Sequence, residues 1–319
     1  MKKVYTIGEA LIDFIPHEVG VPIHDVVSFK KMPGGAPANV AAAVAKLGGS
    51  SSFIGQVGED SFGSFLKDTL SQSGVDVTYM RRTNEANTAL AFVALKKDGE
   101  RDFVFYRKPS ADMLLTKQDV EGINFTSQDI LHFCSVDLIE ADVKYAHEEV
   151  LHNIKAAGGT VCFDPNVRKN LWDDLEAYQK TIQQFIPYAD ILKVSDDELA
   201  FITGIEEEEA AIRSLLSGSV QLLILTRGKN GVSFFSGKEE VTVEGFEVKA
   251  IDTTGAGDSF IGAFLYQFST MDKHVSAITV EELAKMGHFS NATAAIVTTK
   301  EGAIHALPNI EEVSRFLSK

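Results

Sequence analysis

The residues most able to do chemistry stand in the stretch 250–260, where an acid follows a run of small residues. Asp258 comes directly after Gly255, Ala256 and Gly257, and an apolar segment with a four-residue period follows. This pattern predicts a strand, a tight turn and a helix that begins near Gly257. Backbone N–H groups in a first helical turn bind anions. A carboxylate there would repel the anion unless it removes a proton from a reacting group.

These residues therefore suggest general-base phosphoryl transfer. On the stretch alone, an alternative stays open, in which Asp258 only complements the helix dipole and the glycines only form a turn.

A second small-residue loop lies at residues 33–40 and leads into an Ala-rich helix expected over residues 40–47. Gly34 and Gly35 allow the backbone to approach a ligand closely. Asn39 can donate and accept hydrogen bonds, which suits a hydroxylated ligand. Asp13 falls just past the first expected strand, residues 4–8, where ligands bind in open α/β sheets.

The elements that must position these residues alternate along the chain. We expect strands at 129–133, 160–164, 190–194 and 221–226, with helices at about 140–157, 175–187, 196–203 and 206–217. Residues 232–235 and 241–248 predict antiparallel edge strands, and residues 280–297 predict a helix. This alternation is typical of a parallel sheet with helices on both faces. Polar residues after several strands place a site at the carboxyl edge of the sheet.

One segment interrupts the alternation. Residues 88–96 and 101–106 have a period of two and are joined by residues 97–100, in which Asp-Gly indicates a hairpin. Together with the extended segment at about residues 10–32, this hairpin could form a small second sheet that covers the site. Arg107 would stand where that sheet rejoins the body.

Composition limits the function classes. The chain has 319 residues and a formal net charge of −15, which argues against nucleic acid or an anionic membrane as a partner. Cys134 and Cys162 lie in apolar runs without metal-type spacing, so we expect buried thiols. Acids appear early in the chain, before any long apolar run, so we expect neither a signal peptide nor a membrane span, and a cytoplasmic protein. The P-loop and dinucleotide fingerprints are absent.

The two loops together carry a resemblance. Residues 34–41, Gly-Gly-Ala-Pro-Ala-Asn-Val-Ala, and residues 252–260, Asp-Thr-Thr-Gly-Ala-Gly-Asp-Ser-Phe, resemble the two signatures of the ribokinase/pfkB sugar kinase family, in the family's order. Residues 8–13 and 103–112 are most similar to bacterial fructokinases. The resemblance implies a ribokinase-like three-layer α/β/α fold with a mostly parallel central sheet. It also implies one kinase domain over residues 1–319, with a small β-sheet lid from about residues 10–32 and 86–112.

The resemblance also implies roles for single residues. Asp258 would be the base, and the Gly255, Ala256 and Gly257 N–H groups would meet the charge on the transferring phosphoryl group. The implied sugar or phosphate ligands are Asp13, Gly34, Gly35, Asn39, Arg107 and Arg168. The implied nucleotide residues are Lys193, Ser195, Glu198, Thr226, Gly228, Gly231 and Asn291. Ser195 stands where the family usually has Asn. Glu198 would organise Mg²⁺ indirectly, and Asp252, Thr254 and Gly302 resemble a monovalent-cation (K⁺) loop.

The expected function is ATP-dependent phosphorylation of a sugar, with fructose and its 6-hydroxyl as the first hypothesis and Mg²⁺ as the cofactor of ATP. A 2-keto-3-deoxygluconate kinase is the main alternative, because Arg107 could meet that sugar's carboxylate. Ribose and nucleoside kinases, and a catalytically silent sugar-binding protein, fit the segments less well. Apolar residues of the small sheet, Phe92, Phe103 and Phe105, predict a homodimer through the lid.

Overall fold

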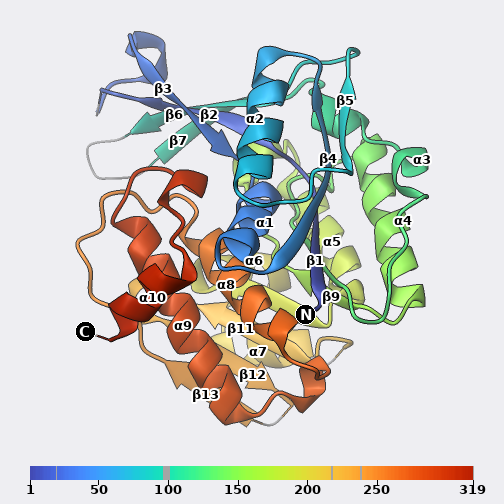
Figure 1. Ribbon diagram of the computed structural model, residues 1–319, viewed down its shortest axis with the longest axis vertical. Helices are drawn as coiled ribbons and strands as arrows, with labels where there is room; N and C mark the ends of the chain where they lie inside the picture. Colours follow the sequence, from blue (N-terminus) through green and yellow to red (C-terminus); the bar gives the residue numbers. More distant parts are fainter. Residues whose placement is uncertain (19, 96–100, 217, 238, 319) are drawn as a thin grey trace.

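A nine-stranded sheet forms the centre of the molecule in the computed structural model (Figure 1), which describes residues 1–18, 20–95, 101–216, 218–237 and 239–318. In spatial order its strands are β13 (Glu239–Val243), β12 (Val232–Ser236), β11 (Leu222–Thr226), β10 (Ile191–Ser195), β9 (Thr160–Phe163), β8 (Ile130–Phe133), β1 (Lys3–Ile7), β4 (Ser50–Gly58) and β5 (Met80–Thr83). All neighbours pair in parallel from β5 to β11, whereas β12 and β13 are antiparallel.

Helices cover both faces of this sheet, which gives three layers. One face packs against α3 (Lys117–Val120), α4 (Asp142–Ala156), α5 (Leu175–Phe185), α6 (Asp196–Thr203) and α7 (Glu208–Leu216). The other face packs against α1 (Ala36–Lys46), α2 (Ser61–Gln72), α8 (Ala256–Thr270) and α9 (Val280–Thr298), with α10 (Ile310–Leu317) outside α9. The three-layer architecture expected from the alternating pattern is thus observed.

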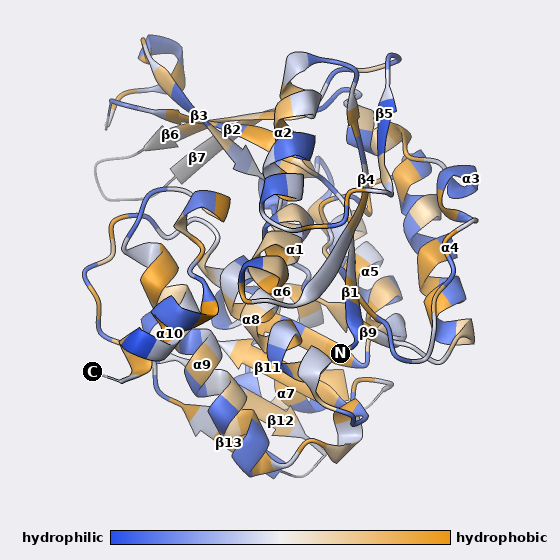
Figure 2. Ribbon diagram, in the orientation of Figure 1, coloured by the Kyte–Doolittle hydropathy of each residue, from blue (hydrophilic) through white to orange (hydrophobic). Residues whose placement is uncertain are grey.

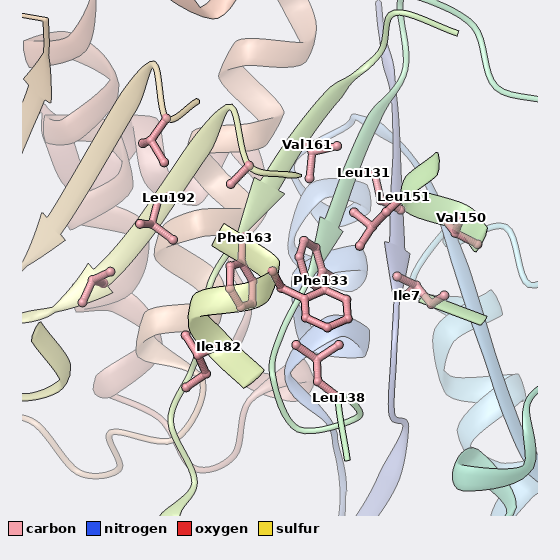
Figure 3. Packing of buried hydrophobic residues seen from close by; sticks show 14 of the residues in the cluster. Ile7, Leu131, Phe133, Leu138, Val150, Leu151, Val161, Phe163, Ile182 and Leu192 are labelled. Atoms are coloured by element: carbon pink, nitrogen blue, oxygen red, sulfur yellow. The ribbon is translucent and has the colours of Figure 1, made fainter. Parts of the chain in front are cut away.

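Buried apolar side chains alternate between the two faces of each strand. Phe133 of β8 and Phe163 of β9 stack with ring centroids 4.3 Å apart beneath α4 and α5 (Figure 3). Their neighbours His132 and Cys162 point to the opposite face, toward α1 and α8. In Figure 2, many helices show both hydrophobic (orange) and hydrophilic (blue) residues, as expected of helices that bury one face and expose the other. Among the described residues, every helix is too short or too polar to span a lipid bilayer.

Close contact between α1 and α8 depends on small residues. A Cβ atom added to Gly262 of α8 would lie 2.5 Å from Cβ of Ala43 in α1, so only glycine permits this approach. The two helices begin beside each other at the carboxyl edge of the sheet, which brings Asn39 and Asp258 together.

A separate four-stranded sheet, called the small sheet below, lies at one end of the molecule (Figure 1). Its order is β3 (Phe29–Gly34), β2 (Leu11–Pro16), β6 (Leu90–Leu95) and β7 (Arg101–Tyr106). β6 and β7 pair antiparallel, and β2 pairs parallel to β6, so the expected union of the hairpin with the segment near residues 10–32 is observed. The predicted turn at residues 97–100 lies outside the described residues.

Some boundaries differ from the sequence-based expectation. Helix α1 begins at Ala36 rather than at residue 40, because Pro37 occupies a first-turn position where proline's missing N–H costs nothing. The predicted edge strand 241–248 is observed as β13 and ends at Val243. There a Cβ on Gly245 would lie 2.2 Å from the Lys229 carbonyl oxygen, so the chain leaves the sheet against a turn.

Candidate active site

A cavity of about 280 Å³ lies at the carboxyl edge of the central sheet, beneath the small sheet. Its walls come from the ends of β1, β8 and β9, from β2 and β7, and from the first turns of α1 and α8. The lining residues are Glu9, Leu11, Asp13, Gly35, Ala36, Asn39, Phe105, Val136, Asn166, Arg168, Leu171, Lys193, Thr253, Thr254, Gly255, Gly257 and Asp258. Both small-residue loops singled out in the sequence therefore meet at one site.

Asp258 stands in the first turn of α8, on the cavity wall. Gly255 has the left-handed conformation (φ 75°) and caps the helix, so α8 begins at Ala256. Asn39 Nδ2 donates to Asp258 Oδ2 across 2.8 Å, and Asn166 Nδ2 donates to Oδ1 across 3.2 Å. Burial raises the pKa of Asp258 above its ordinary value, while these two amides, Arg168 and Lys193 limit the rise. Such a carboxylate is oriented and remains a proton acceptor.

The first-turn N–H groups are not equivalent. The Ala256 N–H donates to the Thr253 carbonyl oxygen at 3.2 Å, so this predicted anion donor is already engaged. Gly255 and Gly257 line the cavity. A Cβ on Gly255 would lie 2.6 Å from Cβ of Ala303, which explains why a side chain is not tolerated there.

Asn166 belongs to the polar run Asp164-Pro165-Asn166 after β9, but sequence analysis assigned it no role of its own. Its φ of 48° is the only positive value among the described non-glycine residues. Asparagine tolerates this conformation better than most residues. The conformation belongs to a residue whose side chain donates to Asp258. Polar residues at a strand end were the available signal in the sequence.

Two glycines shape the opposite wall through close contacts within the protein. A Cβ on Gly34 would lie 2.1 Å from Asp13 Oδ2, and a Cβ on Gly35 would lie 2.3 Å from the Glu9 carbonyl oxygen. Asp13 and Gly34 are close because β2 and β3 pair antiparallel. Asp13, Gly35 and Asn39 thus gather on one side of the cavity, and Gly34 supports Asp13 from behind.

Lys193 of β10 lies deep in the cavity and forms a buried ion pair with Asp164, with Nζ 2.9 Å from Oδ2. Burial alone would lower the pKa of Lys193, but Asp164, Glu198 and Asp258 raise it above the ordinary value. Burial also raises the pKa of Asp164 to about 6. Lys193 Nζ lies 3.3 Å from the position of a Cβ on Gly257. A fixed positive charge therefore sits under the α8 terminus.

The two predicted arginines lie in different environments. Arg168 is exposed and lines the cavity. Arg107 is only 6% exposed, and its guanidinium group is held between the carboxylates of Asp112 and Asp137. From the sequence we expected Arg107 to reach the ligand. In the structure, its guanidinium group donates hydrogen bonds to these two buried acids. Arg107 instead joins the end of β7 to the body.

Four of the predicted nucleotide residues gather at the β11–β12 end of the sheet. Thr226 ends β11, and Gly228 and Gly231 form the turn that follows. A Cβ on Gly231 would lie 2.0 Å from the Val243 carbonyl oxygen, and Asn291 of α9 donates to the same carbonyl oxygen at 3.2 Å. These contacts bring the turn, the segment after β13 and α9 together.

Ser195 and Glu198 form the capping box of α6. Glu198 accepts hydrogen bonds from the Ser195 N–H through Oε2, at 3.0 Å, and from the Val167 N–H through Oε1. The segment before α6 is thereby tied to the loop after β9.

Asp252, Thr254 and Gly302 are brought together. Asp252 Oδ1 accepts from the Thr254 N–H at 2.8 Å and Oδ2 accepts from the Gly302 N–H at 2.9 Å. The acid thus holds the loop before α8 against the loop after α9.

Known proteins are similar to this chain over nearly their whole length. The chain matches the pfkB family carbohydrate kinases over residues 1–310. It is 44% identical over 316 residues to probable fructokinase-5 of Arabidopsis thaliana, with 98% of this chain and 97% of the relative covered. The structure of fructokinase from Vibrio cholerae O395 in a fructose, ADP and calcium ion bound form is 34% identical, with a TM-score of 0.90 and 99% of both chains covered. Fructokinase from Xylella fastidiosa with bound ATP is 35% identical, with a TM-score of 0.87 over 99% of this chain and 98% of that one.

The chain therefore belongs to the pfkB family of carbohydrate kinases, and its fold is that of the ribokinase-type enzymes. It is an ATP-dependent sugar kinase, and the resemblance noted at residues 34–41 and 252–260 is confirmed.

Proposed function

We propose that this kinase transfers the terminal phosphoryl group of ATP to the 6-hydroxyl of fructose, in line, with Asp258 as general base. The observation that carries the proposal is one cavity that Asp13 lines together with Asp258 of the first turn of α8 and its hydrogen-bond partner Asn39. Carboxylate and amide groups suit a ligand rich in hydroxyls. The fructokinases among the relatives, matched over nearly all of their length, favour fructose.

In the proposed mechanism, Asn39 and Asn166 orient the Asp258 carboxylate toward the sugar hydroxyl and keep it ionised. Asp258 removes the hydroxyl proton as the bond between the sugar oxygen and the terminal phosphorus forms and the bond from that phosphorus to ADP breaks, so that ADP leaves. The N–H groups of Gly255 and Gly257, with the positive charge of Lys193 beneath them, stabilise charge on the transferring phosphoryl group. The small sheet, acting as a lid over one kinase domain, would exclude water.

Mg²⁺ bound to ATP would neutralise phosphate charge and orient the phosphates. Within the described residues no three His, Cys, Asp or Glu side chains are arranged so that they could hold a metal ion. This fits a cation held mainly by phosphates and water. Both Glu198 oxygens already accept backbone N–H groups, which suits an indirect role through water. Ser195, Thr226, Gly228, Gly231 and Asn291 would line the nucleotide. Asp252 would shape the carbonyl loop at Thr254 and Gly302 that could hold K⁺.

One experiment tests the substrate. ADP release is measured with fructose, ribose, 2-keto-3-deoxygluconate and nucleosides, and the sugar phosphate is identified by NMR. We expect the highest kcat/KM with fructose and a product phosphorylated at carbon 6. Preference for 2-keto-3-deoxygluconate would contradict the proposal and favour Arg168, the exposed cation of the cavity, as partner of that sugar's carboxylate. Tight sugar binding without turnover would favour a silent binding protein.

A second experiment tests the base. Asp258→Asn keeps the shape of the side chain but cannot accept the proton. Turnover should fall by roughly 10²–10⁴ while sugar binding, followed by titration calorimetry, persists. Turnover near the wild-type level would rule out the base.

We also propose a homodimer through the lid, in the cytoplasm. Phe14, Phe29, Phe92 and Tyr106 form an aromatic cluster on the small sheet, and Tyr106 is 63% exposed. A second copy would cover this surface. The side chain of Phe103 lies outside the described residues, and Phe105 faces the cavity instead. Sedimentation velocity at micromolar concentration should give a dimer, and Tyr106→Glu should give a monomer.

A further inference from the structure

Glu9 is a buried acid on the substrate side of the cavity. It follows β1, on the same wall as Asp13 and Asn39, and is 3% exposed. Its Oε1 atom accepts a hydrogen bond of 2.9 Å from the Ala36 N–H, in the first turn of α1. Its Oε2 atom is also buried, and it has no hydrogen-bond partner among the described residues. One oxygen is therefore fixed to the protein and the other is left unsatisfied.

The described residues around Glu9 do not supply the missing donor. Arg107, whose charge acts on Glu9, donates hydrogen bonds to Asp112 and Asp137. Burial raises the pKa of Glu9 to about 7, although Arg107 and the backbone N–H groups of Glu9 and Ala36 oppose the rise. A buried carboxyl oxygen without a donor costs stability unless a ligand provides one. Because Glu9 lines the cavity, that donor can come from the bound substrate.

We propose that Glu9 binds the sugar and helps to select it: Oε2 accepts a hydrogen bond from the 3- or 4-hydroxyl of the bound ketohexose, while Oε1 stays bound to the Ala36 N–H. The inference rests on the proposed function and adds a specificity-determining residue to the wall formed by Asp13 and Asn39. Glu9 differs from Asp258 in its task, because it holds the sugar without taking its proton.

Glu9→Gln tests this assignment. Its amide oxygen can keep the bond from the Ala36 N–H, and its NH₂ group then presents donors where Oε2 was an acceptor. KM and kcat are measured at pH 8.5, above the pKa of Glu9, with fructose and with its epimers at carbons 3 and 4, psicose and tagatose. The KM for fructose should rise by about 10–100-fold with little change in kcat, which is the loss of one hydrogen bond to a charged group. The rise should disappear for the one epimer whose hydroxyl points away from Glu9.

Two further variants separate binding from folding. Asp112→Asn perturbs the same buried charges without touching the cavity, so it should lower the melting temperature and leave the ratios of KM between epimers unchanged. Glu9→Asp is the alternative variant if Glu9→Gln does not fold. It keeps the carboxylate but shortens the side chain by one methylene group, so the KM for fructose should rise. An unchanged KM for fructose, or an equal rise for all three sugars, would overturn the inference alone. A wild-type enzyme inactive on all three ketohexoses would overturn both this inference and the proposed substrate.

Discussion

Asn39 donates its side-chain amide to Oδ2 of Asp258 across 2.8 Å, although 219 positions separate the two residues in the chain. The bond joins the first turns of two helices, α1 and α8. Because an amide N–H stabilises the ionised carboxylate, the bond lowers a pKa that burial raises. The residue expected to hold the sugar therefore also tunes the base.

The first prediction follows from this bond. In Asn39→Ala the pKa of Asp258 should rise further, since a group that favours the charged form is lost. The base works when ionised, so kcat is lost as pH falls through this pKa, and the acid limb of the kcat–pH profile should move to higher pH. Asn166→Ala should move it less, because that bond is longer, at 3.2 Å. An unmoved acid limb in both variants would contradict the tuning.

The second prediction separates the two arginines. Arg107→Ala leaves two acids buried without their partner, so the free energy of unfolding should fall by about 3–5 kcal/mol. Arg168→Ala, at an exposed position, should change it by less than about 0.5 kcal/mol and lower kcat/KM instead. Urea titrations and steady-state kinetics check both variants. Equal loss of stability in the two would contradict the buried role of Arg107.

The third prediction concerns the cap of α8. Gly255→Ala forces a side chain into the left-handed region, which costs roughly 1–2 kcal/mol, and also places its Cβ 2.6 Å from Ala303. We expect a lower melting temperature and loss of turnover. The matched control is Gly48→Ala, where φ is also positive (94°) but nothing lies within 4 Å of the added atom. It should lose stability only and keep its kcat.

The fourth prediction is a pH effect on stability. Burial lowers the pKa of His147 to about 4, from 6.5. Between pH 6.5 and 4, His147 is therefore protonated in the unfolded chain but neutral in the folded protein. The free energy of unfolding falls increasingly as pH falls toward 4. Buried acids such as Asp164, with raised pKa values, act in the opposite direction. The wild-type curve alone therefore does not isolate the histidine.

The difference between wild type and His147→Gln does isolate it. The two proteins can differ in their free energy of unfolding at pH 7.5. Relative to that difference, the free energy of unfolding of the wild type should fall by about 1.4 kcal/mol for each pH unit below 6.5. Urea titrations at pH 7.5, 6.0 and 5.0 measure this difference. Parallel pH profiles of the two proteins would refute a neutral buried imidazole.

The layers and the centre of the site were predictable from local patterns. Strands β8 to β11 are short apolar runs, and α4 to α7 each have one apolar face, so their types and approximate limits follow from periodicity. The loops at Gly34 and Gly255 could be located because positive φ values and close backbone approaches leave a glycine signature.

The pairing of charges could not be read from the sequence. Arg107 meets Asp137, 30 positions away, and Lys193 of β10 meets Asp164 of the neighbouring β9 end. Which acid neutralises which base depends on strand order and on the face each strand presents, neither of which has a local signal. The same holds for Glu9 and Asn166, whose roles depend on helix termini brought in from distant parts of the chain.

The contact of α1 with α8 has a consequence for synthesis of the protein. Ribosomes add about 5–20 residues per second. Synthesis of α8, which buries the face of α1 that contains Ala43, is therefore completed roughly 10–45 s after synthesis of α1. During that time the nascent chain displays an apolar helix, and it acquires both its cover and its proton acceptor in the same late step. Chains that end before α8 therefore lack the proton acceptor and expose the apolar face of α1 to chaperones and proteases. Truncated chains cannot accumulate as active enzyme.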